Sequence, residues 1–247
     1  MGQKLTAGHK DALFRGDRAK EYDKFELAVP HYRHFQATVG RLVEMVAQES
    51  TNKTRKRITI AECGVGTGNT LEAVTKTTHK LRKIKQLFAV DASPEMIEIA
   101  IRRVKNPKVI AVREDFLKFL IDRTRSDQHL DCIYSAYTIH NLRQEQQLSI
   151  FRGIFEKLNK GGYFIDADLL AHPNAQIQKS DFEWQLRMFK KHLHPKLAEE
   201  WIEHYREDAK RYFKLEELID ILREIGFQID VVFREKLEAI IIAKKGG

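Results

Sequence analysis

The sequence IAECGVGTGNT, residues 60–70, places three glycines directly after a short apolar run. They are Gly64, Gly66 and Gly68, and an acid, Glu62, stands two positions ahead of the first. Glycine in a regular element costs conformational entropy, so this cluster indicates either a tight turn or a backbone that approaches another group closely. The dinucleotide-binding spacing G-x-G-x-x-G does not fit, because position 69 is Asn69.

Strand-like and helix-like segments alternate from this stretch onward. We expect strands at 58–63, 87–91, 108–112, 130–137 and 163–170, and helices at 68–80, 93–106, 116–125 and 143–159. Ser93 and Pro94 are typical helix-start residues. Lys160-Gly161-Gly162 is expected to end the helix at 143–159. This alternation predicts a doubly wound, mostly parallel α/β sheet.

Other helices and a hairpin surround this pattern. Two helices, within 10–25 and 31–48, form an N-terminal helical cover (1–57) that ends in the polar connector NKTRKR, residues 52–57. A helical insertion rich in aromatic residues is expected at about 178–213, and a further helix is capped near Gly226. Two strands joined by a turn at Glu235-Lys236 end the main domain (58–247) and close one sheet edge.

Composition limits the classes of protein that fit. The chain has 247 residues, 43% of them hydrophobic and 32% charged, which is typical of a soluble globular protein. No apolar run is long enough for a membrane span, and the polar N-terminus lacks a signal-peptide core. Cys63 and Cys132 lie in strand-like runs without metal-ligand spacing, so we expect reduced thiols, no metal site, no membrane partner and a cytoplasmic protein.

The net charge of +8 is unevenly distributed. The excess lies in the N-terminal half, notably in residues 52–57 and in KTTHKLRKIK, residues 76–85. Such stretches indicate either an acidic partner such as RNA or a solvated surface.

The glycines occupy the first strand–helix turn, which is where a wound sheet binds its ligand. The pattern E-C-G-V-G-T-G resembles the first motif of class I S-adenosylmethionine-dependent methyltransferases. Four later segments resemble further motifs of that family in the same order: VDASPEM, REDFLKF, CIYSAYTIHNL and LNKGGYFIDAD. The resemblance covers about residues 58–247 and implies a Rossmann-like seven-stranded sheet whose C-terminal strand is antiparallel.

The resemblance implies S-adenosyl-L-methionine as the cofactor and assigns residues to it. Asp91 would accept hydrogen bonds from the ribose hydroxyls, Asp115 from the adenine amino group, and Phe116 would offer a backbone N–H. Asp115 could instead cap the helix that follows it. The residues expected to bind the cofactor are Tyr32, Glu62, Gly64, Gly66, Gly68, Asp91, Ala92, Asp115, Phe116 and Ala136.

The layout also resembles a narrower group, the carboxy-S-adenosylmethionine synthases that serve tRNA modification. The shared features are VPHY at 29–32, DASPEMI at 91–97, TIHNL at 138–142 and the helical insertion. This resemblance implies that Tyr32 touches the cofactor. The sequence departs from the group in two places. The group carries an asparagine near the position of Ala136. The group also needs an arginine in the insertion to hold the extra carboxylate, and the nearest candidate here is Arg206.

We therefore expect a methyltransferase for a small-molecule acceptor, with a carboxy-S-adenosylmethionine synthase or a tRNA-modifying enzyme as the alternative. A hydroxyl or carbon acceptor needs a general base, and His140 is the candidate catalytic residue, unless it is a structural turn residue. Asp168 is expected to be structural. The insertion would cover the substrate in a closed apolar pocket, or serve as core or as a homodimer contact.

Overall fold

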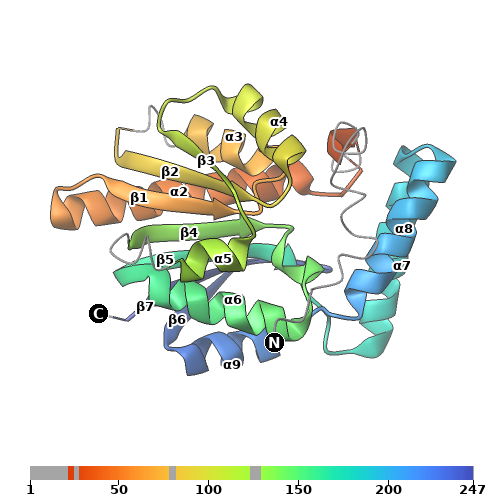
Figure 1. Ribbon diagram of the computed structural model, residues 1–247. Helices are drawn as coiled ribbons and strands as arrows, with labels where there is room; N and C mark the ends of the chain where they lie inside the picture. The colour runs from red at the N-terminus through yellow and green to blue at the C-terminus, as the bar shows by residue number, and fades with distance from the viewer. Residues whose placement is uncertain (1–21, 25–27, 78–81, 123–128, 247) are drawn as a thin grey trace, which may run out of the picture.

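A computed structural model describes residues 22–24, 28–77, 82–122 and 129–246 (Figure 1). Its centre is one seven-stranded sheet in the order β3-β2-β1-β4-β5-β7-β6. The strands are β1 (Ile58–Cys63), β2 (Ile84–Asp91), β3 (Val109–Arg113), β4 (Leu130–Ala136), β5 (Leu158–Leu169), β6 (Phe227–Glu235) and β7 (Glu238–Lys245). Because only β7 runs antiparallel to its neighbours, the predicted mostly parallel, doubly wound sheet is confirmed.

Helices cover both faces of the sheet (Figure 1). On one face lie α2 (Tyr32–Thr54), α3 (Asn69–Thr77) and α4 (Pro94–Val104), and on the other lie α5 (Phe116–Ile121), α6 (Gln144–Lys157) and α9 (Leu215–Ile225). The short 3-10 helix η3 (Ile139–Asn141) follows β4. The insertion forms a helix pair, α7 (Ala175–His192) and α8 (Pro195–Ala209), at one end of the sheet.

Two apolar cores result from the alternation of side chains along each strand. Along β5, Phe164 packs into the core beneath α5, α6 and α9, whereas Ile165 packs into the core beneath α2 and α3. A strand buried on both faces must be apolar at successive positions, as this one is.

The order of the strands places the ligand site. β1 pairs with β2 on one side and with β4 on the other, so the chain changes direction across the sheet at β1. In wound sheets this switch point leaves a crevice at the carboxyl ends of the strands. The glycine stretch lies there, directly after β1.

The fifth strand differs from the prediction. α6 ends at Lys157 because Leu158 is already extended, and the strand starts there and not at residue 163. Leu158 pairs with Leu130, but Cys132 pairs with Tyr163, so residues between them bulge out of register. Gly161 adopts a positive φ of 73° inside this irregularity, so it belongs to the strand and does not close the helix.

Other boundaries also shift. α2 continues through Thr54, which shortens the predicted connector 52–57, and β2 starts at Ile84, earlier than predicted. The insertion is two helices, broken at His194 before Pro195. The remainder of the predicted helix at 10–25, apart from residues 22–24, lies outside the described residues, as do 78–81 and 123–128 within two further predicted helices.

The aromatic residues of the insertion serve largely as core. Phe189, Trp201, Tyr205 and Tyr212 are each less than one tenth exposed and join the cluster beneath α2. Phe189 and Tyr205 meet edge to face with ring centroids 4.7 Å apart. Among the described residues, no helix is both long and apolar enough to span a membrane.

We expect an alanine at Gly68, in the turn after β1, to destabilise the fold more than an alanine at Gly161 in β5. A Cβ at Gly68 would lie 2.8 Å from the Cα of Ala100 in α4, and its φ is +86°. A Cβ at Gly161 would meet nothing within 4 Å at a similar φ of +73°. We expect Gly68→Ala to lower the free energy of unfolding by about 2–4 kcal/mol through strain and overpacking.

Gly161→Ala is the matched control, because it adds backbone strain of about 1 kcal/mol without a clash. Urea denaturation of both variants measures the difference. Equal losses for the two would show that the approach of α4 to the turn does not constrain position 68.

Candidate functional site

The three glycines of the opening stretch serve different purposes. Gly64 has a φ of +74°, and a Cβ there would lie 2.2 Å from the side chain of Thr138. Gly68 is pressed against Ala100, as described above. Gly66 also has a positive φ, +52°, but a Cβ there would meet nothing within 4 Å. The outer two glycines therefore permit packing, and the middle one leaves open space beside its backbone.

Asp91 at the end of β2 binds this loop. One carboxylate oxygen accepts the Gly66 N–H at 2.9 Å, and the other accepts the Ser93 N–H at 2.8 Å. Burial raises the pKa of Asp91, and these backbone donors partly offset that rise. The carboxylate thus stands beside the open position at Gly66, where the sequence analysis expects the ribose.

The third strand brings Asp115 and Phe116 to the same edge. Asp115 caps α5 by accepting the Lys118 N–H at 3.2 Å, which is the structural alternative considered above. Its side chain remains exposed, whereas Phe116 is buried against the sheet. Ala92, next to Asp91, is exposed at the same edge.

Glu62 and Ala136 lie beneath the loop, at the ends of β1 and β4. Glu62 is 1% exposed, and the Tyr134 hydroxyl donates to its Oε2 at 3.0 Å. Ala136 pairs with Ala167 of β5 and is partly exposed. The two strands that flank the switch point are therefore joined by a buried polar contact.

Tyr32, at the start of α2, stacks on Tyr137, which directly follows β4. Their ring centroids are 5.6 Å apart at an interplanar angle of 23°. Tyr137 has a φ of +50°, which is rare for a bulky residue and marks a constrained position. Its hydroxyl donates to Glu238 of β7, a buried residue that sequence reasoning missed because it lies about one hundred residues away.

His140 and Asp168 form a buried pair. Asp168 accepts the His140 backbone N–H at 3.0 Å, and its other oxygen contacts His140 Nδ1. The two side chains are 6% and 4% exposed. Among the described residues, no partner hydrogen-bonds to the Nε2 of His140. Burial and the Asp168 charge raise the pKa of the neighbouring Asp166, which favours its neutral form.

Tyr212, between α8 and α9, stands edge-on to the His140 ring with centroids 5.6 Å apart. Its hydroxyl is buried without a hydrogen-bond partner in the described part of the chain. Burial raises the pKa of Tyr212, so the hydroxyl stays protonated and able to donate. Sequence reasoning had placed Tyr212 only within an aromatic-rich segment.

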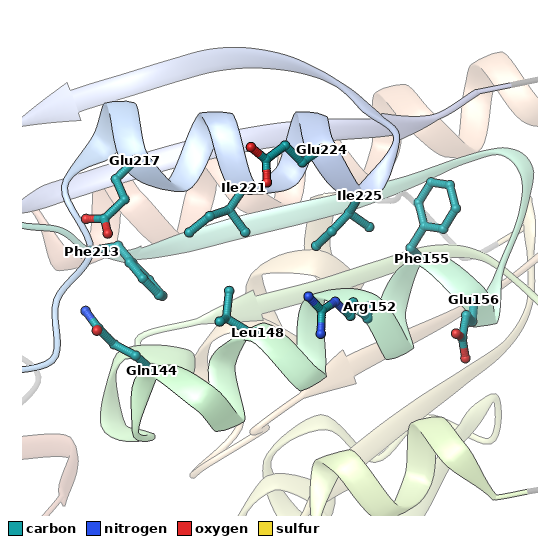
Figure 2. Close-up of a pocket in the computed structure, with 10 residues that line it drawn as sticks. All are labelled: Gln144, Leu148, Arg152, Phe155, Glu156, Phe213, Glu217, Ile221, Glu224 and Ile225. Atoms are coloured by element: carbon teal, nitrogen blue, oxygen red, sulfur yellow. The ribbon is translucent and has the colours of Figure 1, made fainter.

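A groove of about 640 Å³ lies between α6 and α9, and its lining includes Leu148, Phe155, Ile221 and Ile225 (Figure 2). The closed apolar pocket expected under the insertion stays a prediction. None of the predicted site residues lines this groove. Within the described ranges, no group of three or more His, Cys, Asp and Glu side chains is arranged to hold a metal ion.

A family model described as a methyltransferase domain matches residues 60–162, from β1 into β5. The matched segment contains the glycine loop, Asp91, Asp115 and Ala136. Residues 60–162 are a class I S-adenosylmethionine-dependent methyltransferase domain. The cofactor of this class is S-adenosyl-L-methionine, and the open backbone at Gly66 beside Asp91 fits a nucleoside ligand.

Curated relatives carry the same description. An uncharacterized methyltransferase of Bacillus cytotoxicus is 31% identical over 154 residues, which are 62% of this chain and 64% of that protein. One from Bacillus mycoides is 31% identical over 112 residues, 45% of this chain and 47% of that protein. The matches to these relatives thus cover less than two thirds of their length.

Solved methyltransferases share the fold. The N-methyltransferase NodS from Bradyrhizobium japonicum, solved with S-adenosyl-L-homocysteine, is 15% identical with a TM-score of 0.58 and 96% coverage of both chains. The plantazolicin methyltransferase BpumL is 13% identical with a TM-score of 0.67, covering 94% of this chain and 91% of that one. These likenesses confirm the methyltransferase fold.

The position of Asp91 in the methyltransferase domain predicts a loss of cofactor binding on substitution. Asp91→Ala removes the acceptor for the Gly66 N–H as well as the carboxylate expected at the ribose. We expect the Kd for S-adenosylmethionine to rise about 30-fold or more, since hydrogen bonds to charged groups contribute roughly 1.5–3 kcal/mol each. Calorimetric titration measures it, and an unchanged Kd would place the cofactor elsewhere.

The raised pKa of Glu238 predicts that the free energy of unfolding depends on pH. Burial raises its pKa from 4.5 to about 8. The folded chain then keeps a proton that the unfolded chain releases, so the free energy of unfolding falls as pH rises through that interval. Glu238→Gln cannot lose a proton and should flatten this decline, by up to roughly 1.4 kcal/mol per pH unit.

Urea unfolding at several pH values between 5 and 8 tests this prediction. Glu224→Gln, which changes an exposed acid of α9, is the control and should leave the slope as in the wild type. A Glu238→Gln variant with the wild-type slope would contradict the assignment.

Proposed function

We propose that this protein is an enzyme that transfers a methyl group from S-adenosylmethionine to a small-molecule acceptor, with His140 as the general base. The observation that carries the proposal is the buried pair of His140 and Asp168 at the carboxyl edge of the sheet. A buried imidazole whose Nδ1 contacts a carboxylate presents its Nε2 as the basic nitrogen.

The residues proposed to hold the cofactor gather at this edge. Gly66 and Asp91 would contact the nucleoside, with Asp115 and Phe116 at the adenine and Ala136 at the methionine part. Gly64 and Gly68 let the loop pack, Glu62 supports it from below, and Ala92 lines its rim. Tyr32 would lie over the site through its stack on Tyr137.

When bound, S-adenosylmethionine supplies a methyl group on an electrophilic sulfonium. In the proposed reaction His140 Nε2 would take the proton of an acceptor hydroxyl or carbon acid. The acceptor atom would gain the methyl group as the methyl–sulfur bond breaks, and S-adenosylhomocysteine would leave with the electron pair of that bond. Asp168 holds the imidazole in the required tautomer and stabilises the imidazolium that results. The Tyr212 hydroxyl, which is buried and has no hydrogen-bond partner among the described residues, would donate a hydrogen bond to the acceptor.

The distribution of charge supports a small molecule over RNA. Arg55, Lys56 and Arg57 directly precede β1, and Arg82 and Lys83 directly precede β2. They therefore lie at the amino ends of the strands, whereas His140 and Asp91 follow carboxyl ends. A phosphate backbone bound by these cations would be remote from the proposed site of methyl transfer.

The position of Arg206 supports methyl transfer over synthesis of carboxy-S-adenosylmethionine. That arginine of α8 is 58% exposed and lies 4.0 Å from Glu203, so it forms a surface pair. A carboxylated cofactor would need a cation close to the cofactor, and Arg206 points to solvent instead.

A labelling assay tests the proposal. Tritium from methyl-labelled S-adenosylmethionine is followed into a panel of phenols, hydroxy acids and 1,3-dicarbonyl compounds, and into total tRNA in a parallel reaction. With the acceptor that is labelled, His140→Gln should lower kcat at least about 100-fold and leave cofactor affinity unchanged. Asp168→Asn should also lower kcat, because the imidazole loses its orienting carboxylate.

His192→Gln changes an exposed histidine at the end of α7 and is the matched control. Full activity of His140→Gln would contradict its role as base. Labelling of tRNA alone would overturn the small-molecule acceptor.

A further inference from the structure

Asp23 binds the glycine loop, residues 64–68, from outside the segment 60–162 that matches the methyltransferase domain. It belongs to the helical residues 22–24, which precede α2. Its Oδ1 accepts the hydroxyl of Thr67 at 2.6 Å and the side-chain amide of Asn69 at 3.2 Å. These two residues flank Gly68, so one carboxylate oxygen binds both sides of the glycine turn.

The second oxygen of Asp23 joins the same turn to α4. It forms an ion pair with Arg103, which also donates to the side-chain carbonyl of Asn69. Arg103 is 19% exposed and Asp23 37%, so the pair is partly shielded from water. Asp23, Asn69 and Arg103 therefore form a closed triangle of contacts between three elements that are separate in sequence.

The same residues 22–24 also reach the insertion. The ring of Tyr22 packs against Trp201 of α8 with centroids 5.6 Å apart and an interplanar angle of 60°. Figure 1 shows this short helical segment, in red, between α4 and α8. Adjacent side chains thus fix the segment to the cofactor loop on one side and to the proposed acceptor cover on the other.

Backbone hydrogen bonds hold the loop at Gly64, Val65 and Gly68, and Asp23 adds a side-chain contact at Thr67. Three of its five residues are glycines with positive φ, and the backbone at Gly66 borders open space. A loop that is ordered before binding spares the ligand the entropic cost of ordering it. Thr67, only 2% exposed, is held by Asp23, so the orientation of the Gly66 N–H depends in part on this contact.

We propose that Asp23 is a positioning residue of the cofactor site, which holds the glycine loop in its binding conformation through Thr67, Asn69 and Arg103. The proposal rests on the proposed function, because it assumes that S-adenosylmethionine binds at this loop. Asp23 acts through these residues and does not itself touch the reacting atoms.

Calorimetric titration of S-adenosylmethionine into the full chain tests the role of Asp23. Asp23→Ala should weaken binding about tenfold, as expected for the loss of charge-assisted hydrogen bonds that order a site. Asp23→Glu, which keeps the carboxylate, should recover most of the affinity. Asp220→Asn, in an exposed Asp–Arg pair of α9 whose side chains lie 3.8 Å apart, is the control and should bind as the wild type does.

The thermal midpoint of each variant without ligand separates positioning from general stabilisation. We expect Asp23→Ala to shift that midpoint no more than Asp220→Asn does, while the upward shift produced by S-adenosylmethionine shrinks. If Asp23→Ala binds as tightly as the wild type, or if Asp23→Glu is as weak as Asp23→Ala, the positioning role is overturned. If the wild type itself does not bind, the proposed function fails before Asp23 is tested.

Discussion

The close approach of the glycine turn to two other elements is the constraint on which the site depends. Gly64 leaves room for Thr138, which follows β4, and Gly68 leaves room for Ala100 in α4. Side chains at either position would push these elements away and open the switch point of the sheet. Because the turn packs so tightly at its ends, its middle residue, Gly66, is held with its N–H on Asp91 and open space beside it.

Two buried acids lie at this edge of the sheet: Asp168 near the carboxyl end of β5, and Glu238 at the amino end of the antiparallel β7. Asp168 is satisfied by His140, and Glu238 by the Tyr137 hydroxyl, each partner coming from the segment after β4. Burial without these partners would cost several kcal/mol per group, so the pairs fix the path of the chain beyond the strand. That same path holds His140 against Asp168.

The insertion contributes to both the fold and the site. Trp201 and Tyr205 of α8 pack into the core beneath α2, which anchors the helix pair to the sheet. Tyr22 then packs on Trp201 while its neighbour Asp23 binds the glycine loop. Residues 22–24, the glycine loop and the insertion therefore share contacts, whereas the cations of residues 55–57 lie at the opposite edge of the sheet. Such a separation of charge from the site suits an acceptor that is not a polyanion.

The succession of strands and helices and the glycine turn could be predicted from the sequence, because hydrophobic periodicity and glycine spacing are local properties of the chain. Asp91 and His140 could be named as candidate site residues, and their roles stay predictions. Sequence reasoning placed β1 at the residues observed but missed the early start of β5, where Gly161 belongs to a bulge that only pairing with β4 reveals. Asp168 as the partner of His140, Glu238 as the partner of Tyr137 and Asp23 on the loop required the tertiary structure. Each of these contacts joins residues at least 28 positions apart, and no local pattern encodes which distant side chain satisfies a buried polar group.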